Sequence, residues 1–112
     1  MRAVIVSAWV MLSTAALAAG PEIPVNDVNA QCAKLDYSES RAYCVRTEQF
    51  NYDVLQSLWP RASARAKQTS IRNAMPMVGS SSYYDALLTY LQAEMRNDQD
   101  AVDRVAPPTF SR

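Results

Sequence analysis

The chain has 112 residues, with 11 basic and 11 acidic side chains, a formal net charge of zero and no histidine. A neutral chain has no bulk attraction to nucleic acid or to an acidic membrane. The lack of histidine removes the commonest general base, the nucleophilic triads that depend on it and most zinc sites. With only two glycines, no glycine-rich phosphate loop is expected either. We therefore expect one small domain that is not an enzyme and has no metal or cofactor.

The first residues are typical of a secretory signal peptide. Arg2 precedes an apolar run from Ala3 to Leu17, and Ala16-Leu17-Ala18 supplies the small residues that signal peptidase requires. We expect residues 1–18 to be the signal peptide and the mature chain to be periplasmic or secreted. An uncleaved membrane anchor is the alternative, but the apolar run is at the short end for a span of about 20 residues.

Residues 19–26 are predicted to form an extended leader, because Pro21 and Pro24 resist helix formation and strand pairing. Ordered structure is expected to begin near Asn26. A short helix from Asp27 to Leu35 would then place Val28, Cys32 and Leu35 on one side, with Cys32 pointing into the core.

Cys32 and Cys44 are the two cysteines of the chain. An exported protein with an even number of cysteines usually pairs them. We expect a structural disulfide, which for a loop of this length stabilises the fold by roughly 3 kcal/mol. A redox role is not indicated, since the spacing is not Cys-x-x-Cys.

The longest predicted helix runs from Arg41 to Trp59, after a turn at residues 36–40, and Pro60 sets its end. Its apolar residues recur at intervals of three and four, which predicts a buried stripe. That stripe comprises Tyr43, Thr47, Phe50, Val54 and Leu58, widened by Cys44, Leu55 and Trp59.

Two further helices are predicted, from Ser63 to Met75 and from Ser82 to Arg104. Ser82 and Asp85 resemble a capping box for the second of these, and Pro107-Pro108 would stop it. The expected fold is all-α: three to four short helices form a small disulfide-stapled bundle over residues 27–104, with a flexible tail at 105–112. Short connections would allow a four-helix arrangement.

Charge is distributed unevenly over the last two helices. Residues 61–84 contain four basic side chains and no acid, whereas residues 85–112 contain five acids and three arginines. Opposed charge on neighbouring helices is the simplest explanation, and a docking surface for an acidic partner is the alternative. A calcium site at Asn97, Asp98, Asp100 and Asp103 is not supported, because these residues lack the glycine turn and distal glutamate of a calcium loop.

One stretch invites a comparison: Tyr43-Cys44-Val45, Glu48-Gln49, Tyr52, Leu55 and Leu58-Trp59-Pro60. Over about residues 32–60 the chain resembles a group of small exported alphaproteobacterial helical proteins of unknown function with a Cys-x11-Cys pair. Relatives in that group often have a second cysteine pair downstream, where this chain has Thr69, Ser70 and Tyr90. The resemblance implies export and a helical fold, and it implies no activity.

These observations predict an exported periplasmic binding or accessory protein that inhibits or stabilises a larger envelope protein, without binding nucleic acid or inserting in the membrane after signal cleavage. The expected contact residues are Arg61, Arg65, Lys67, Arg72, Tyr83 and Tyr84. The alternative is an envelope structural or stress protein with affinity for wall polymer or a membrane surface. A third hypothesis, a hydrolase that uses the carboxylates of Glu39, Glu48 and Asp53, would need a deep cleft that so small a helical domain rarely forms.

Overall fold

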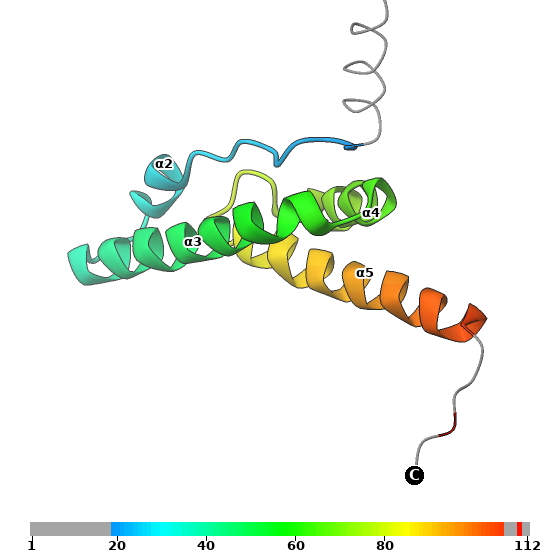
Figure 1. The fold of residues 1–112 in the computed structure, drawn as a ribbon. Coiled ribbons are helices and arrows are strands. Elements are labelled where there is room, and N and C mark those ends of the chain that lie inside the picture. Colours follow the sequence, from blue (N-terminus) through cyan, green and yellow to red (C-terminus); the bar gives the residue numbers. More distant parts are fainter. Residues whose placement is uncertain (1–18, 107–109, 111–112) are drawn as a thin grey trace, which may run out of the picture.

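The computed structural model describes residues 19–106 and residue 110 (Figure 1). The predicted signal peptide and the predicted stop at Pro107-Pro108 lie outside the described residues. Within the described part every regular element is helical, so the predicted all-α fold is confirmed. The elements in chain order are α2 (Val28–Cys32), α3 (Ser38–Leu58), a 3-10 turn η2 (Trp59–Arg61), α4 (Ala64–Ala74), a second 3-10 turn η3 (Met75–Met77) and α5 (Tyr83–Val105).

Local sequence explains most helix ends. The Asp27 carboxylate accepts a hydrogen bond from the Ala30 N–H at 3.0 Å and caps α2, which has only five residues. The Ser63 hydroxyl accepts from the Ala66 N–H at 3.0 Å and caps α4 in the same way. Pro60 lies in the 3-10 turn that ends α3, close to the predicted helix end, although Trp59 before it keeps the α conformation (φ −55°, ψ −46°) that the proline was expected to disfavour. Helix α3 begins at Ser38, earlier than predicted.

Helix α5 is the centre of the fold, because α3 and α4 both pack on it. Leu87 and Leu91 are fully buried, and the small residues Ala66 and Ala74 of α4 are fully buried with them in one core. Figure 1 shows that the C-terminal part of α5 extends beyond the other helices, and residues 101–106 are exposed. No helix in the described part is long and apolar enough to cross a membrane.

Helix α3 buries a different face from the one that its apolar pattern predicts. Glu48, Asn51 and Leu55 are its buried residues, whereas Tyr43 and Phe50 are each 66% exposed. The predicted burial of these two aromatic side chains is therefore wrong. Of the rest of the predicted stripe, Thr47 is exposed and Val54 and Leu58 are half-buried. The row of buried residues is rotated about the helix axis by about 100° from the predicted row, which is the angle between successive residues in an α-helix.

Residues 19–27, here called the strap, run in an extended path along α3 from the α4 side to α2 (Figure 1). These residues lie outside every helix and strand, as expected for an extended leader, but their hydrogen bonds to the rest of the fold begin at Ala19 and not near Asn26. Hydrogen bonds from Trp59, Lys67 and Tyr84 hold the strap from Ala19 onward. The strap is therefore part of the folded body.

Candidate functional site

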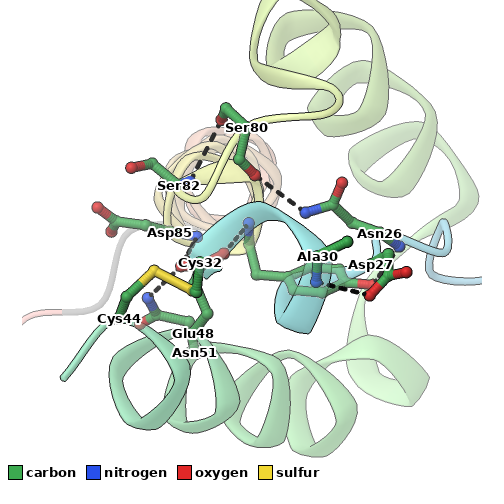
Figure 2. The surroundings of a disulfide bond; sticks show 11 residues. Asn26, Asp27, Ala30, Cys32, Cys44, Glu48, Asn51, Ser80, Ser82 and Asp85 are labelled. Atoms are coloured by element: carbon green, nitrogen blue, oxygen red, sulfur yellow. Dashed lines mark hydrogen bonds between the residues drawn. A yellow bond between two sulfur atoms is a disulfide. The ribbon is translucent and has the colours of Figure 1, made fainter. Parts of the chain in front are cut away.

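A buried carboxylate joins α3 to the first turn of α5 (Figure 2). Glu48 is 2% exposed, and its Oε2 accepts a hydrogen bond from the Tyr84 N–H at 2.8 Å. Its Oε1 accepts from the Asp85 N–H at 3.1 Å and from Asn51 Nδ2 at 3.0 Å. The first N–H groups of a helix have no partner within the helix and favour negative charge nearby. Glu48 therefore caps α5 from another helix.

The capping box predicted at Ser82 and Asp85 is wrong. The Ser82 side chain makes no capping hydrogen bond. The Glu48 carboxylate takes the N–H groups of Tyr84 and Asp85 instead, because it enters from α3 beneath the first turn of α5. In the sequence this arrangement is marked only by Glu48 and Asn51, which follow Cys44 by four and seven residues, and polar residues give no hydrophobic signal.

The disulfide lies beside this cap (Figure 2). Cys32 and Cys44 are bonded, with their Cα atoms 5.7 Å apart, and the Cys32 side chain is fully buried. The predicted pairing is confirmed, and it ties the short α2 to α3. Cys44 and Glu48 lie one turn apart on α3, so the disulfide and the carboxylate cap fix the same face of that helix toward the interior.

An open groove of about 570 Å³ borders the disulfide and the first turns of α3 and α5. Its walls combine apolar side chains with carboxylates and hydroxyls. The lining residues are Leu35, Glu39, Ser40, Tyr43, Cys44, Thr47, Glu48, Ser81, Ser82 and Asp85. Glu39 and Asp85 lie in the first turns of their helices, where an acid is favoured by the helix dipole.

Exposed aromatic side chains continue from this groove along α3. Tyr43 and Phe50 lie seven residues apart and therefore on one side of the helix, and Tyr37 at the start of α3 is 75% exposed. We call the three together the aromatic edge. The sequence marks Tyr37 as a recognition candidate near a turn, but it does not mark Tyr43 and Phe50, because apolar residues at helical spacing usually form a buried face.

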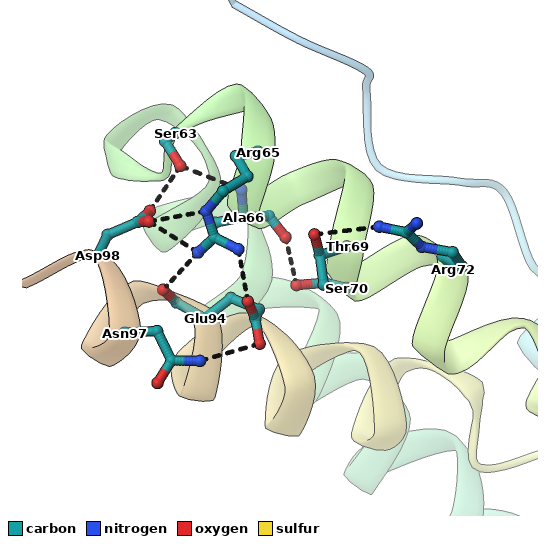
Figure 3. Close-up of polar contacts among 9 residues, drawn as sticks. All are labelled: Ser63, Arg65, Ala66, Thr69, Ser70, Arg72, Glu94, Asn97 and Asp98. Atoms are coloured by element: carbon teal, nitrogen blue, oxygen red, sulfur yellow. Dashed lines mark hydrogen bonds and ion pairs between the residues drawn. The ribbon is translucent and has the colours of Figure 1, made fainter. Parts of the chain in front are cut away.

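The basic helix α4 is largely engaged within the protein (Figure 3). Arg65 forms ion pairs with Glu94 and Asp98 of α5, each at 2.7 Å. Hydrogen bonds from Ser63 and Arg65 lower the pKa of the Asp98 carboxyl, and pairing with Glu94 and Asp98 raises the pKa of Arg65. The predicted opposition of charge on neighbouring helices is confirmed for these residues.

Three of the predicted contact residues are buried and do not form a surface. Lys67 is 4% exposed, donates to the Ala19 carbonyl and lies 5.9 Å from the centre of the Trp59 ring. Tyr83 and Tyr84 are buried in the core, and burial raises the pKa of both. Their predicted role as exposed contacts is wrong because the strap and α3 cover this end of α5. Arg61 and Arg72 are exposed as predicted.

The carboxylates of the hydrolase hypothesis are not brought together. Glu39 and Glu48 both line the groove, but Asp53 does not, and it accepts a hydrogen bond from Gln49 at 2.8 Å. The oxygens of Glu48 are occupied by its three donors. Among the residues described, no group of three or more histidine, cysteine, aspartate or glutamate side chains is arranged to hold a metal ion.

No protein-family model, curated protein or solved structure matches the chain. The function of this domain is therefore inferred from its exposed residues and from the contacts that orient them.

Proposed function

We propose that this chain is an exported binding protein that acts as an inhibitor or stabilising subunit of a larger envelope protein. Export to the periplasm or beyond is part of the proposal, and two features support it. One is the signal-like sequence of residues 1–18, and the other is the disulfide, a bond that persists in oxidising compartments.

The observation that carries the proposal is the aromatic edge of α3. Large aromatic side chains leave water when they are buried against a partner, and they are enriched in the centres of protein interfaces. Here Tyr43 and Phe50 are two-thirds exposed on a helix whose other side is fixed by a disulfide and a carboxylate cap. A rigid helix that presents aromatic side chains to solvent suits a partner-binding surface.

The contact surface proposed here differs from the basic helix that the sequence suggests. Arg65 is paired with two acids and Lys67 is buried, so Arg72 of α4 and Arg61 of the preceding turn η2 are the basic residues left for a partner. Two separated arginines offer a partner less apolar surface than three exposed aromatic side chains, of which Tyr43 lines the groove. We place the contact on Tyr37, Tyr43 and Phe50.

We propose further that the protein is not an enzyme. The Glu48 carboxylate is held by the backbone of α5, and the other acids that line the groove lie at helix starts. Because three hydrogen bonds occupy its oxygens, Glu48 is not free to form with Glu39 the carboxylate pair that glycosidic cleavage requires.

The proposal is tested by affinity capture of the tagged, exported chain from a crosslinked envelope fraction, followed by mass spectrometry and by reconstitution with the purified partner. The informative variant is Tyr43→Ser with Phe50→Ser. The matched control is Arg61→Ser with Arg72→Ser, which changes two exposed residues, one in η2 and one in α4.

We expect one dominant protein that is lost with the aromatic variant and retained with the arginine variant. Loss with the arginine variant alone would return the contact to the basic helix. Retention of wall fragments or lipid without a protein would instead support the envelope structural alternative.

A further inference from the structure

The strap lies on the side of α3 opposite to the aromatic edge, because Tyr52 and Trp59 beneath it are about half a helical turn away from Tyr43 and Phe50. Its sequence from Gly20 to Pro24 reads Gly-Pro-Glu-Ile-Pro, which contains two prolines at Pro-x-x-Pro spacing. Extended segments with this spacing are ligands of aromatic grooves in several protein classes. Here such a segment is bound by the protein's own helices.

The first half of the strap is held by Trp59 and Lys67. The Trp59 indole N–H donates to the Pro21 carbonyl at 2.9 Å, and the Lys67 ammonium donates to the Ala19 carbonyl. Gly20 has a φ of +75°, and a Cβ at this position would lie 2.9 Å from Ala64 Cα. The backbone therefore touches α4 at a point where only glycine fits.

The second half is held by Tyr84. Its hydroxyl donates to the Pro24 carbonyl at 2.9 Å and accepts from the Asn26 N–H at 2.8 Å. Its ring lies 5.0 Å from the ring of Tyr52, at a tilted angle. Pro21, Ile23 and Pro24 are half-buried in this position, whereas Glu22 and Val25 are exposed.

The groove presents hydrogen-bond donors to the backbone carbonyls of the two prolines. Proline has no N–H, so at Pro21 and Pro24 the backbone offers only acceptors, and the side chains that reach these two residues act as donors. Prolines also limit the freedom that an extended peptide loses on binding. Open hollows of about 430 Å³ beside Trp59 and about 340 Å³ beside Tyr84 border the strap and are lined partly by its own residues.

We propose that the surface formed by Tyr52, Trp59, Lys67 and Tyr84 is a binding site for an extended Pro-x-x-Pro peptide of another protein, and that the strap occupies it as a competing internal ligand. This inference is independent of the aromatic edge and goes beyond the proposed function. Binding in trans requires displacement of the strap, so weakening the strap should strengthen binding of an added peptide.

The test measures binding of a fluorescently labelled peptide with the sequence of residues 19–26 by fluorescence anisotropy. The proteins are the purified exported chain and its variant Pro21→Ala with Pro24→Ala, which weakens the internal ligand and leaves the groove unchanged. A second variant, Gly20→Val, displaces the strap by a clash with Ala64. Circular dichroism verifies that each variant retains its helices.

We expect the peptide to bind the proline variant about tenfold more tightly than the unmodified chain, and the same peptide with both prolines replaced by alanine to bind about tenfold more weakly. Adding Trp59→Phe to the proline variant should abolish the gain, because the indole donor is lost. Two results would overturn the proposal. One is equal binding of the natural peptide and the peptide without prolines, and the other is equal binding of the natural peptide to the unmodified protein and to the Pro21→Ala, Pro24→Ala protein. If the Pro21→Ala, Pro24→Ala protein loses its helices, peptide binding to the Gly20→Val protein is compared with binding to the unmodified protein instead. Tighter binding to Gly20→Val would support the proposal, and equal binding would overturn it.

Discussion

The two helices that pack on α5 do so by different means. Helix α4 contributes small residues that are fully buried, Ala66, Ser70 and Ala74, with the Arg65 ion pairs at the margin. Helix α3 contributes Leu55 together with the buried Glu48, which binds the start of α5 and accepts a further hydrogen bond from the buried Asn51 of its own helix. The α4 contact is mainly the packing of small side chains. The α3 contact also depends on a buried polar group whose hydrogen bonds must all be made.

This difference determines which side of α3 faces solvent. Buried polar groups are costly unless each hydrogen bond is made, so Glu48 can occupy only an orientation in which it reaches the N–H groups of α5. That orientation turns Tyr43 and Phe50 outward. The α3 contact thus buries less apolar surface than the predicted orientation would. In return, the hydrogen bonds of Glu48 fix the orientation of α3, and the aromatic edge is exposed.

The largest effect is expected from removal of the disulfide that sets α3 against α2. Cys32→Ala with Cys44→Ala should lower the free energy of unfolding by about 3 kcal/mol, because the closed loop restricts the unfolded chain. Urea denaturation measures this change. Reduction of the unmodified chain should reproduce it, and an unchanged midpoint in both cases would contradict a structural role for the bond.

Removal of the carboxylate cap tests the polar contact directly. Glu48→Ala leaves two buried N–H groups of α5 without a partner and should cost about 2 kcal/mol of unfolding free energy. Glu39→Ala, an exposed acid in the first turn of α3, is the control and should change stability by no more than about 0.5 kcal/mol. Similar costs for both variants would show that the buried Glu48 cap stabilises the fold no more than an exposed acid does, and would contradict its role in the α3 contact.

A smaller effect is expected where α5 holds the strap. Tyr84→Phe removes the hydroxyl that binds Pro24 and Asn26 and should cost about 1 kcal/mol at neutral pH. Tyr43→Phe removes an exposed hydroxyl, and no measurable change is expected.

The same residue predicts a pH dependence. Burial raises the pKa of Tyr84 above that in the unfolded chain, so the neutral hydroxyl stabilises the fold below about pH 10, and this contribution is lost as pH rises through the folded-state pKa. Stability should therefore fall at alkaline pH, and it should fall less in Tyr84→Phe. Denaturation series at neutral and alkaline pH compare the two chains, and parallel losses would contradict this assignment.

The smallest effect is expected at the margin of the α4 contact. Hydrogen bonds from Ser63 and Arg65 lower the pKa of Asp98, so its stabilising contribution is present above the unfolded-state pKa of about 4 and disappears as pH falls through the folded-state value. Asp98→Asn should be slightly less stable than the unmodified chain at neutral pH. The two melting temperatures should converge in acid, and a constant difference would exclude the ion pair as its cause.

Local signals predicted the helical fold and most of its boundaries. Pro60, the Ser63 cap and the cysteine spacing each act within a few residues, so the sequence is enough to interpret them. The opposition of charge between α4 and α5 followed from the charge distribution, but Arg65, which makes these pairs, was expected to contact a partner.

The orientation of α3 and the docking of the strap could not be obtained in this way. Glu48 binds α5 across 36 residues of chain, and Tyr84 binds Pro24 across 60. A polar residue that satisfies a distant helix end leaves no periodic apolar signal, and two prolines indicate an extended path without indicating what it lies on. The burial of Tyr83 and Tyr84 likewise depends on residues that are distant along the chain, so the sequence alone predicts them on the surface.

The most direct test of the α3 orientation is hydroxyl-radical footprinting of the folded chain with mass spectrometry, since the oxidation rate of an aromatic side chain follows its exposure to solvent. Fast oxidation of Tyr37, Tyr43 and Phe50, with protection of Tyr83 and Tyr84, is the predicted result. Protection of Tyr43 and Phe50 in the isolated chain would contradict the account, because the aromatic edge would then be buried and could not serve as a contact surface.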